Sequence, residues 1–419
     1  MKLLFLAPYL PSPPQSGAPR RVHGLMSELA RRHDVSLLAF TVPGEDTAAA
    51  IAATSQYCSQ VVTVEGRHLD RALGGSRKRR LQLRTMFGMK SFERLAYYDA
   101  GFQRELDRLI EHGEFDVITT EHAQMACYRL PHTARLVLDE HNIEYDILRR
   151  TTSAERASVR KIYSWVNFLK LRNEERAAWE QFDGVTLTSE RDELVLCGDA
   201  PGTRTAVIPN GVDTEFFAPS ETPVDADTIL FFGAINYYPN TEGLLYFLDE
   251  VFPLVKREHP GVKFMIVGQQ PPPAIAARAA EDVIVTGLVD DVRPYLERAA
   301  VVIAPLRIGG GTRLKIVEAM SMGKAIVATT LGAEGLDVSD GENILLADTP
   351  DEFASQVTRA LRDPRLTARL GRAARKRAEE QYSWKGVVDR LERFYAELPS
   401  PSAQVKPVHR METKVSDRG

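Results

Sequence analysis

The stretch Val301-Val-Ile-Ala-Pro-Leu-Arg-Ile-Gly-Gly-Gly-Thr-Arg-Leu-Lys-Ile-Val-Glu-Ala-Met320 decides the fold of this chain. It begins as a buried strand and ends as a helix. The three glycines between them let the backbone turn tightly and direct several N–H groups into one concavity. The helix directs its partial positive end at the same place, and Arg313 and Lys315 add formal charge there. The arrangement suits a diphosphate, and an ordinary strand-to-helix connection is the alternative interpretation.

The turn is neither of the two common nucleotide-binding loops. The mononucleotide spacing G-x-x-x-x-G-K-[ST] is absent. The dinucleotide pattern G-x-G-x-x-G is also absent, and the turn lies late in the chain instead of after the first strand. Glu318 lies about a turn and a half into the helix. That is too deep for a phosphate contact, but it is well placed to accept hydrogen bonds from hydroxyl groups.

Length and composition indicate a globular protein of two domains. A chain of 419 residues suits two domains of about two hundred residues each. The apolar content of 44% and the charged content of 26% are ordinary, and the net charge of −4 argues against a general nucleic-acid binder. The three cysteines are widely separated, which predicts reduced thiols in a cytoplasmic protein. No apolar run approaches the length of a membrane span.

Short apolar runs alternate with helical patterns in both halves of the chain, which predicts two parallel α/β sheets. In the first half a helix is predicted over residues 20–32, and strands over 3–7, 35–39, 61–64, 117–119, 136–138 and 184–187. In the second half helices are predicted over 242–251 and 351–361, and strands over 228–232, 263–267, 283–286, 301–304, 325–328 and 343–346. Each half is therefore expected to be a doubly wound, Rossmann-like sheet.

The boundary between the halves is predicted at Ile208-Pro-Asn-Gly-Val-Asp213, which carries a stop and turn signal. A surface turn within one domain is the alternative. The expected domains are residues 1–208 and 209–398, with a last helix that is free to pack back on the first domain. Residues 399–419 are rich in Pro and Ser and then polar, so a disordered tail is expected.

The continuation from Glu318 through Gly323 to Gly332-Ala-Glu-Gly335 closely resembles the nucleotide-sugar-binding segment of the retaining glycosyltransferases of family four. The resemblance covers roughly residues 1–395 and implies a GT-B fold, in which two Rossmann-like domains face a central cleft. It implies transfer of a sugar from a UDP- or GDP-sugar to a glycan, lipid-linked or small-molecule acceptor, with retention of configuration, in polysaccharide or glycoconjugate biosynthesis. A GT-B-fold nucleotide-sugar epimerase and a non-catalytic nucleotide-sugar-binding subunit are the alternatives.

The resemblance assigns most donor-binding positions to the second domain. Glu318 matches the family's second glutamate, which binds the ribose, whereas Gly310 stands where the first glutamate contacts the donor sugar. Asn236 and Asn240 stand at or near positions where relatives have Arg and Lys, with turn and capping chemistry as the alternative. The loop 287–291 lies beside the base in relatives, and a plain loop is the alternative. The predicted donor-binding residues are Gly17, Gly233, Asn236, Val289, Gly309, Gly310, Gly311, Thr312, Arg313, Lys315 and Glu318.

Two polar clusters follow neighbouring strands of the first domain. Relatives have an Asp, four residues and then a His that lines the donor; counting from Asp116 reaches Glu121, and His122 is one residue further. We predict Glu121, His122 and Lys315 as catalytic residues. Acceptor-side candidates are Arg20, Asp139, His141, Asn142 and Glu144. Ligands bind at the carboxyl ends of strands in these folds, while structural roles at strand ends, and a solvated basic face for Arg20, are the alternatives.

No metal or other cofactor is expected. The turn 309–315 contains no carboxylate, although Mg²⁺ and Mn²⁺ prefer oxygen ligands, so protein charge and the helix dipole would stabilise the diphosphate.

A basic segment, residues 67–94, carries nine cations against two acidic residues and includes Arg77, Lys78, Arg79 and Arg80. It is either a solvated loop and helix or a contact for anionic lipid headgroups or a lipid diphosphate acceptor. The expected location is the cytoplasm. The lipid-contact alternative predicts, more specifically, peripheral contact at the inner face of the membrane.

Overall fold

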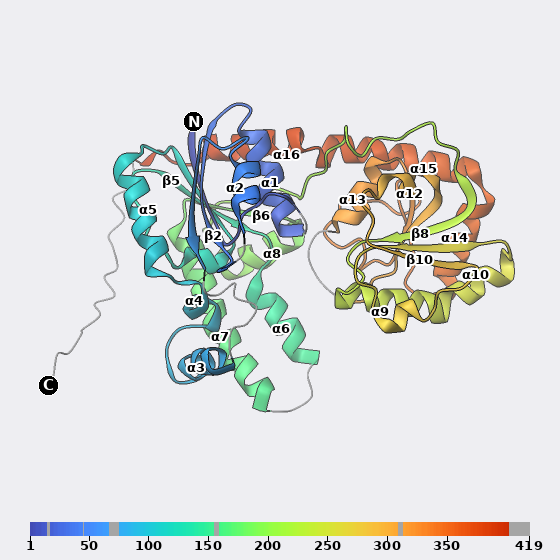
Figure 1. Ribbon diagram of the computed structural model, residues 1–419, viewed down its shortest axis with the longest axis horizontal. Coiled ribbons are helices and arrows are strands. Elements are labelled where there is room, and N and C mark those ends of the chain that lie inside the picture. The colour runs from blue at the N-terminus through green and yellow to red at the C-terminus, as the bar shows by residue number, and fades with distance from the viewer. Residues whose placement is uncertain (15–16, 45, 67–74, 155–158, 309–312, 402–419) are drawn as a thin grey trace.

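The computed structural model describes residues 1–14, 17–44, 46–66, 75–154, 159–308 and 313–401. The chain forms two lobes, each built on one parallel sheet with helices on both faces (Figure 1). This confirms the predicted α/β, doubly wound architecture. The predicted tail lies almost wholly outside the described residues.

The sheet of the first lobe has seven strands in the order β3-β2-β1-β4-β5-β6-β7. All of its neighbouring strands are parallel. The strands are β1 Lys2–Ala7, β2 Asp34–Thr41, β3 Gln60–Glu65, β4 Val117–Glu121, β5 Arg135–Glu140, β6 Gly184–Leu187 and β7 Thr205–Val207. The strand order changes direction between β1 and β4, and such a switch point leaves a crevice for ligands at the carboxyl ends of the strands.

Helices cover both faces of this sheet, and for that reason its central strands are apolar along most of their length. In β1 only Lys2 is exposed. The amphipathic helix α5 buries Phe102, Leu106 and Leu109, which recur at helical spacing, and Asp99 caps its first turn. The helical segments of the lobe are α1 Gly17–Leu29, α2 Ala48–Thr54, α3 Gly75–Phe87, α4 Phe92–Tyr97, α5 Ala100–His112, η1 Ala123–Cys127, α6 Glu144–Ala154, α7 Val159–Gln181 and α8 Glu190–Asp199.

The second lobe repeats this plan with six parallel strands in the order β10-β9-β8-β11-β12-β13, and its switch point lies between β8 and β11. Its strands are β8 Asp225–Phe232, β9 Lys263–Val267, β10 Val283–Gly287, β11 Ala299–Ala304, β12 Ala325–Ala328 and β13 Leu345–Leu346. Its helical segments are α9 Tyr238–Tyr246, η2 Phe247–Val251, α10 Phe252–Glu258, α11 Pro273–Ala276, α12 Arg293–Arg298, α13 Leu314–Ser321, α14 Pro350–Arg362, α15 Pro364–Arg377 and η3 Ala378–Tyr382.

The last helix, α16 (Trp384–Glu397), leaves the second lobe and packs on α1 of the first (Figure 1). Val387 and Leu391 share a buried cluster with Val22 and Leu25 of α1. Because α16 belongs to the core of the first lobe, the chain passes between the lobes twice.

The two segments that cross between the lobes lie side by side, and the indole of Trp384 packs against both the linker and α1. Val212 of the linker pairs with Ser383 just before α16. Trp384 fills the space beside Gly24 and Gly211, where an added Cβ would lie only 2.2 Å and 2.4 Å from the ring. Glycine is therefore required at both positions unless the indole moves. No helix within the described part of the chain has the length and apolarity of a membrane span.

Candidate active site at the two switch points

The predicted site residues that the structure describes lie at the carboxyl ends of strands near the switch points of the two sheets. In the first lobe they lie at the ends of β4 and β5 or follow β1, β4 and β5, and in the second lobe they follow β8, β10 and β11. These residues are widely separated in the sequence. Within each lobe, the strand order of the sheet brings them close together.

A buried ion pair supports the switch point of the first lobe. Arg21 donates from Nε and Nη2 to the two carboxylate oxygens of Asp139, at 2.8 and 2.7 Å. Burial opposes ionisation of Asp139, yet Arg21 holds the pKa of this carboxyl well below its usual value. Thr186 also donates to Asp139, at 2.5 Å, and Arg21 reaches the linker through the carbonyl of Ile208, at 2.8 Å. Asp139, predicted on the acceptor side, is only 2% exposed. It therefore lies beneath the surface of the site and holds other residues of the site in position.

Glu121 and His141 form a second buried pair beside the first. His141 Nε2 lies 2.7 Å from Glu121 Oε2 and 3.4 Å from Asp139 Oδ2. Burial and the nearby Asp139 raise the pKa of Glu121 to about 7, although His141 opposes the shift. Burial lowers the pKa of His141, but the two carboxylates outweigh it and raise the value to about 8. Both groups therefore titrate near neutral pH, and their protonation is coupled.

Of the neighbouring residues Glu121 and His122, His122 is the one with a partly exposed side chain. Its backbone φ of 67° lies in the left-handed region, which is strained for a non-glycine residue and is found most often at functional sites. Its Nε2 lies 2.9 Å from the hydroxyl of Tyr9, and its ring lies 3.8 Å from that of His141. Burial and the charge of His141 lower the pKa of His122 well below its usual value, so its imidazole is neutral at physiological pH. Glu121, in contrast, is fully buried.

The remaining acceptor-side candidates lie at the end of β5 and the start of α6. Asn142 and Glu144 are partly exposed, whereas His141 is buried. Burial raises the pKa of Glu144. Glu175 of α7 accepts hydrogen bonds from the backbone N–H groups of Glu144 and Tyr145, at 2.8 and 2.9 Å, and so caps α6.

A partly buried lysine occupies the switch point of the second lobe. Lys315 Nζ donates to Asn240 Oδ1 at 2.8 Å and lies 4.0 Å from the centre of the Phe231 ring. Burial, with the charge of Arg313, lowers the pKa of Lys315 to about 7. Gly233, with φ of 136°, brings its backbone so close that an added Cβ would lie 3.3 Å from Nζ. The positive charge of such a lysine is poorly compensated in the free protein, so its position is suited to binding an anion.

The other donor-side predictions differ in their surroundings. Arg313 is 7% exposed, and burial lowers its pKa. Asn236 is exposed and donates to Gln270 at 2.7 Å. Val289 packs at the edge of the apolar cluster beneath the loop 287–291. Gly309, Gly310, Gly311 and Thr312 lie outside the described residues.

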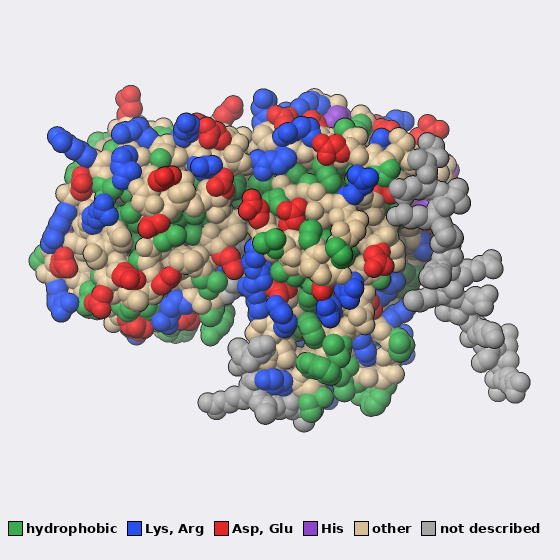
Figure 2. All heavy atoms as spheres, turned by 180° about the vertical axis from the view of Figure 1, so that it is seen from behind, with side chains coloured by type: hydrophobic (Ala, Val, Ile, Leu, Met, Phe, Trp, Pro, Cys, Tyr) green, Lys and Arg blue, Asp and Glu red, His purple; other side chains and the backbone are tan. Residues whose placement is uncertain are grey.

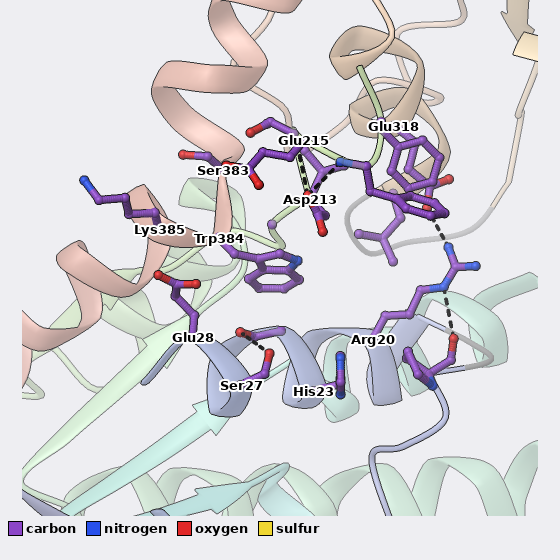
Figure 3. Close-up of a pocket in the computed structure, with 18 of the residues that line it drawn as sticks. Arg20, His23, Ser27, Glu28, Asp213, Glu215, Glu318, Ser383, Trp384 and Lys385 are labelled. Atoms are coloured by element: carbon purple, nitrogen blue, oxygen red, sulfur yellow. Dashed lines mark hydrogen bonds and ion pairs between the residues drawn. The ribbon is translucent and has the colours of Figure 1, made fainter. Parts of the chain in front are cut away.

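The two lobes meet where the first turns of α1 and α13 face each other. Arg20 Nη1 lies 2.5 Å from Glu318 Oε1, and an added Cβ at Gly17 would lie 3.7 Å from Leu314. Figure 3 shows Arg20 reaching across to Glu318, with Trp384 further along the same cavity. The cavity has a volume of about 490 Å³ and lies between α1, the linker, α13 and α16.

A second contact between the lobes involves Glu334 in the turn after β12. Its carboxylate lies 3.5 Å from Arg191 and 3.7 Å from Arg150 of the first lobe. The cleft is therefore bridged by ion pairs at two places.

Comparison with known proteins assigns this architecture. The family model described as Glycosyltransferase Family 4 matches residues 15–216, and the model described as Glycosyl transferases group 1 matches residues 226–363. The chain belongs to the family 4 glycosyltransferases.

Curated relatives match about half of this family 4 chain. It is 30% identical over 223 residues to the phosphatidyl-myo-inositol mannosyltransferase of Mycobacterium tuberculosis, covering 50% of this chain and 58% of the relative. It is 28% identical over 235 residues to the D-inositol 3-phosphate glycosyltransferase of Saccharomonospora viridis, covering 50% and 53%. The chain therefore spans little more than half the length of these relatives.

Solved structures match nearly the whole family 4 chain. The sucrose-phosphate synthase of Thermosynechococcus elongatus superposes with a TM-score of 0.69 at 16% identity, over 94% of this chain and 98% of that one. Anabaena Alr3699/HepE in complex with UDP and glucose gives a TM-score of 0.63 at 17% identity, over 95% and 100%. These likenesses confirm the predicted GT-B fold.

Three residues of the family 4 site were not among the sequence candidates. Tyr9 follows β1 and bonds His122, Arg21 anchors Asp139, and Phe231 lies under Lys315. The carboxyl end of β1 lies beside that of β4 in a doubly wound sheet, and this rule gives a signal for Tyr9. The partner of Arg21 lies 118 residues away, beyond any local pattern.

Among the described residues, three ligand-type side chains with atoms within 4.8 Å of one another occur together at Glu121, Asp139 and His141. Arg21 already contacts both carboxylate oxygens of Asp139. The guanidinium thus supplies the positive charge that a metal ion would bring to this cluster.

Proposed function

We propose that this chain transfers a sugar from a UDP- or GDP-sugar to a glycan, lipid-linked or small-molecule acceptor in glycoconjugate or polysaccharide biosynthesis. The observation that carries the proposal is the partly buried Lys315 at the switch point of the second lobe, which contacts Asn240 and the Phe231 ring. It lies on α13, whose first residue Leu314 meets Gly17 of α1 across the cleft. Membership of family 4 supports it, as do relatives named for mannosyl and glycosyl transfer.

In this proposal the second lobe binds the donor. Lys315 and Arg313 neutralise the diphosphate together with the N-terminal end of α13, and they stabilise it as the leaving group. Glu318 accepts hydrogen bonds from the ribose hydroxyls. Because Arg20 contacts Glu318 at 2.5 Å, ribose binding has to displace this arginine.

The first lobe presents the acceptor. His122, neutral and partly exposed, is the group best placed to bond a sugar or acceptor hydroxyl, with Tyr9 fixing its ring. The donor phosphate takes the acceptor proton, and Glu121 acts through its neighbours because it is fully buried. Transfer retains the anomeric configuration and needs no divalent metal; retention rests on family membership, and metal independence rests on the cations of the second lobe.

The location that fits this function is the cytoplasm, with peripheral contact at the inner face of the membrane. A lipid-linked acceptor would make such contact useful, and the name of one relative specifies a phosphatidyl-inositol acceptor for that protein.

The decisive experiment incubates the full chain with UDP- and GDP-sugars and follows release of the nucleoside diphosphate. Release that depends on an added acceptor, with the sugar recovered on that acceptor, supports transfer. Conversion of the donor to its epimer without an acceptor would show an epimerase, and tight donor binding without either reaction would show a non-catalytic subunit.

A further inference from the structure

A helical projection extends below the sheet of the first lobe (Figure 1). It consists of α3, the N-terminal half of α7 and the end of α6, which lie together below the first sheet in Figure 1. Lys170 of α7 donates to the carbonyl oxygen of Gly88, at 2.7 Å, and also to that of Thr85. These hydrogen bonds hold the end of α3 against α7, so the projection is an ordered part of the first lobe.

The projection exposes large apolar side chains. Phe87 and Met89, at the end of α3 and just beyond it, are 87% and 91% exposed, and Leu83 is 59% exposed. On α7, Ile162 and Trp165 are 61% and 57% exposed. Leu83 and Phe87 are four residues apart and Ile162 and Trp165 are three apart, so each pair lies on one helix face. Figure 2 shows hydrophobic side chains gathered on this projection beside Lys and Arg.

Positive charge surrounds these apolar side chains. Residues 75–90 contain six Lys and Arg residues and no Asp or Glu. Arg77, Lys78, Arg79 and Arg80 are all exposed. Arg80 precedes Leu83 by three residues and Phe87 by seven, which places one cation on the apolar face of α3 and the others beside it.

We propose that this projection binds the surface of an anionic lipid bilayer, with Phe87, Met89 and Trp165 inserted at the headgroup level and the cations of α3 among the lipid phosphates. Aromatic and aliphatic side chains combined with Lys and Arg are the composition of helices that lie in a membrane interface. The core of a protein–protein interface is instead depleted of charged residues. The uniform positive charge also fits the negative potential of an anionic leaflet.

The projection is connected directly to the candidate acceptor side. Helix α6 starts at Glu144, within the polar cluster after β5, and its 11 residues extend about 16 Å toward the projection. If the chain transfers sugar as proposed above, bilayer contact would present a lipid-linked acceptor to the first lobe. The bilayer contact itself does not depend on that activity.

The test is co-sedimentation of the full chain with lipid vesicles in about 0.1 M salt, where surface electrostatics are only partly screened. Vesicles of phosphatidylcholine alone are compared with vesicles containing about 30 mol% phosphatidylglycerol. The wild-type chain is expected to bind the anionic vesicles and to be released by high salt. An Arg79→Glu/Arg80→Glu variant is expected to bind at least about tenfold more weakly, and so is a Phe87→Ser/Met89→Ser variant.

Matched controls change equally exposed residues elsewhere. Arg365→Glu/Arg372→Glu on α15 makes the same charge change, and Leu194→Ser, 74% exposed on α8, removes an exposed apolar side chain. Both controls should bind like the wild type. Equal binding by the α3 variants and the controls would overturn the proposal. So would a dimer in sedimentation velocity that Phe87→Ser dissociates without any vesicle binding, because the surface would then join two copies of this chain.

Discussion

Arg20 of α1 and Glu318 of α13 are 298 residues apart in the chain and form an ion pair at 2.5 Å across the cleft. Glu318 is buried, and Arg20 counteracts the rise in its pKa that burial causes. The carboxylate expected to bind the donor ribose is therefore held by the opposite lobe. We therefore expect donor binding and the relative position of the lobes to be coupled through this pair.

Glu318→Gln is expected to keep the fold and weaken nucleoside diphosphate binding by about tenfold or more, because hydrogen bonds to charged groups contribute about 1.5–3 kcal/mol. Calorimetric titration with UDP and GDP measures the change. Glu281→Gln, an exposed position in the same lobe, is the matched control. Unchanged affinity in Glu318→Gln would contradict the ribose assignment.

Lys315→Ala is expected to lower turnover at saturating donor by about one to two orders of magnitude, since the ammonium stabilises the departing diphosphate more strongly than the intact donor. Lys263→Ala removes an exposed lysine of the same lobe and should leave turnover unchanged. Wild-type turnover in Lys315→Ala would show that the lysine does not contact the leaving group.

Nucleoside diphosphate binding is expected to weaken above pH 7. The pKa of Lys315 in the free protein is lowered to about 7, so above that pH the amine is increasingly neutral. A bound diphosphate favours the ammonium, hence binding takes up a proton and affinity falls by up to about tenfold per pH unit. Calorimetry at pH 8 in buffers of different ionisation enthalpy counts the protons. The same proton uptake in Lys315→Met would assign it to another group.

Arg21→Met is expected to destabilise the protein by about 3–5 kcal/mol, because it leaves the buried Asp139 carboxylate without its partner. Arg32→Ala removes one arginine of an exposed pair with Asp389 and should cost about 1 kcal/mol or less. Urea denaturation compares the two. If Arg21→Met cost no more than Arg32→Ala, the buried pair would not hold the first lobe together.

Activity is expected to survive excess EDTA. The product is expected to have the same anomeric configuration as the donor. In the proposed donor site, Lys315 and Arg313 would supply the positive charge that a metal ion supplies in metal-dependent transferases. NMR of the purified product assigns the linkage. Activity lost in EDTA and restored by Mn²⁺ would disprove metal independence, and an inverted linkage would disprove retention.

The period of apolar residues was enough to predict both sheets. Strands β6, β9 and β12 begin and end at the predicted residues, and a threonine or a glycine directly follows each of them. Strand β7 was not predicted, since Thr205-Ala-Val207 is too short for any periodicity. Helix α9 begins at Tyr238, four residues before its predicted start, because Pro239 is favourable in a first helical turn.

The candidate site was predicted only as far as local pattern reaches. The end of β11 and the start of α13 follow from one contiguous stretch, and Lys315 and Glu318 lie on it. Sequence spacing did not show that Glu121 is fully buried and His122 partly exposed, because the left-handed φ of His122 depends on the tertiary structure. Contacts such as Arg21 with Asp139 depend on tertiary packing between distant segments, which sequence spacing does not encode.

The position of α16 has a consequence for how the protein is made. Val387, Val388 and Tyr395 complete the core of the first lobe, yet the ribosome synthesises them after the entire second lobe. During translation the nascent first lobe lacks these side chains and exposes the apolar surface of α1 that they cover. A cut at the linker would therefore not yield two self-sufficient halves, and residues 1–208 would need the C-terminal helix supplied as a separate peptide to fold.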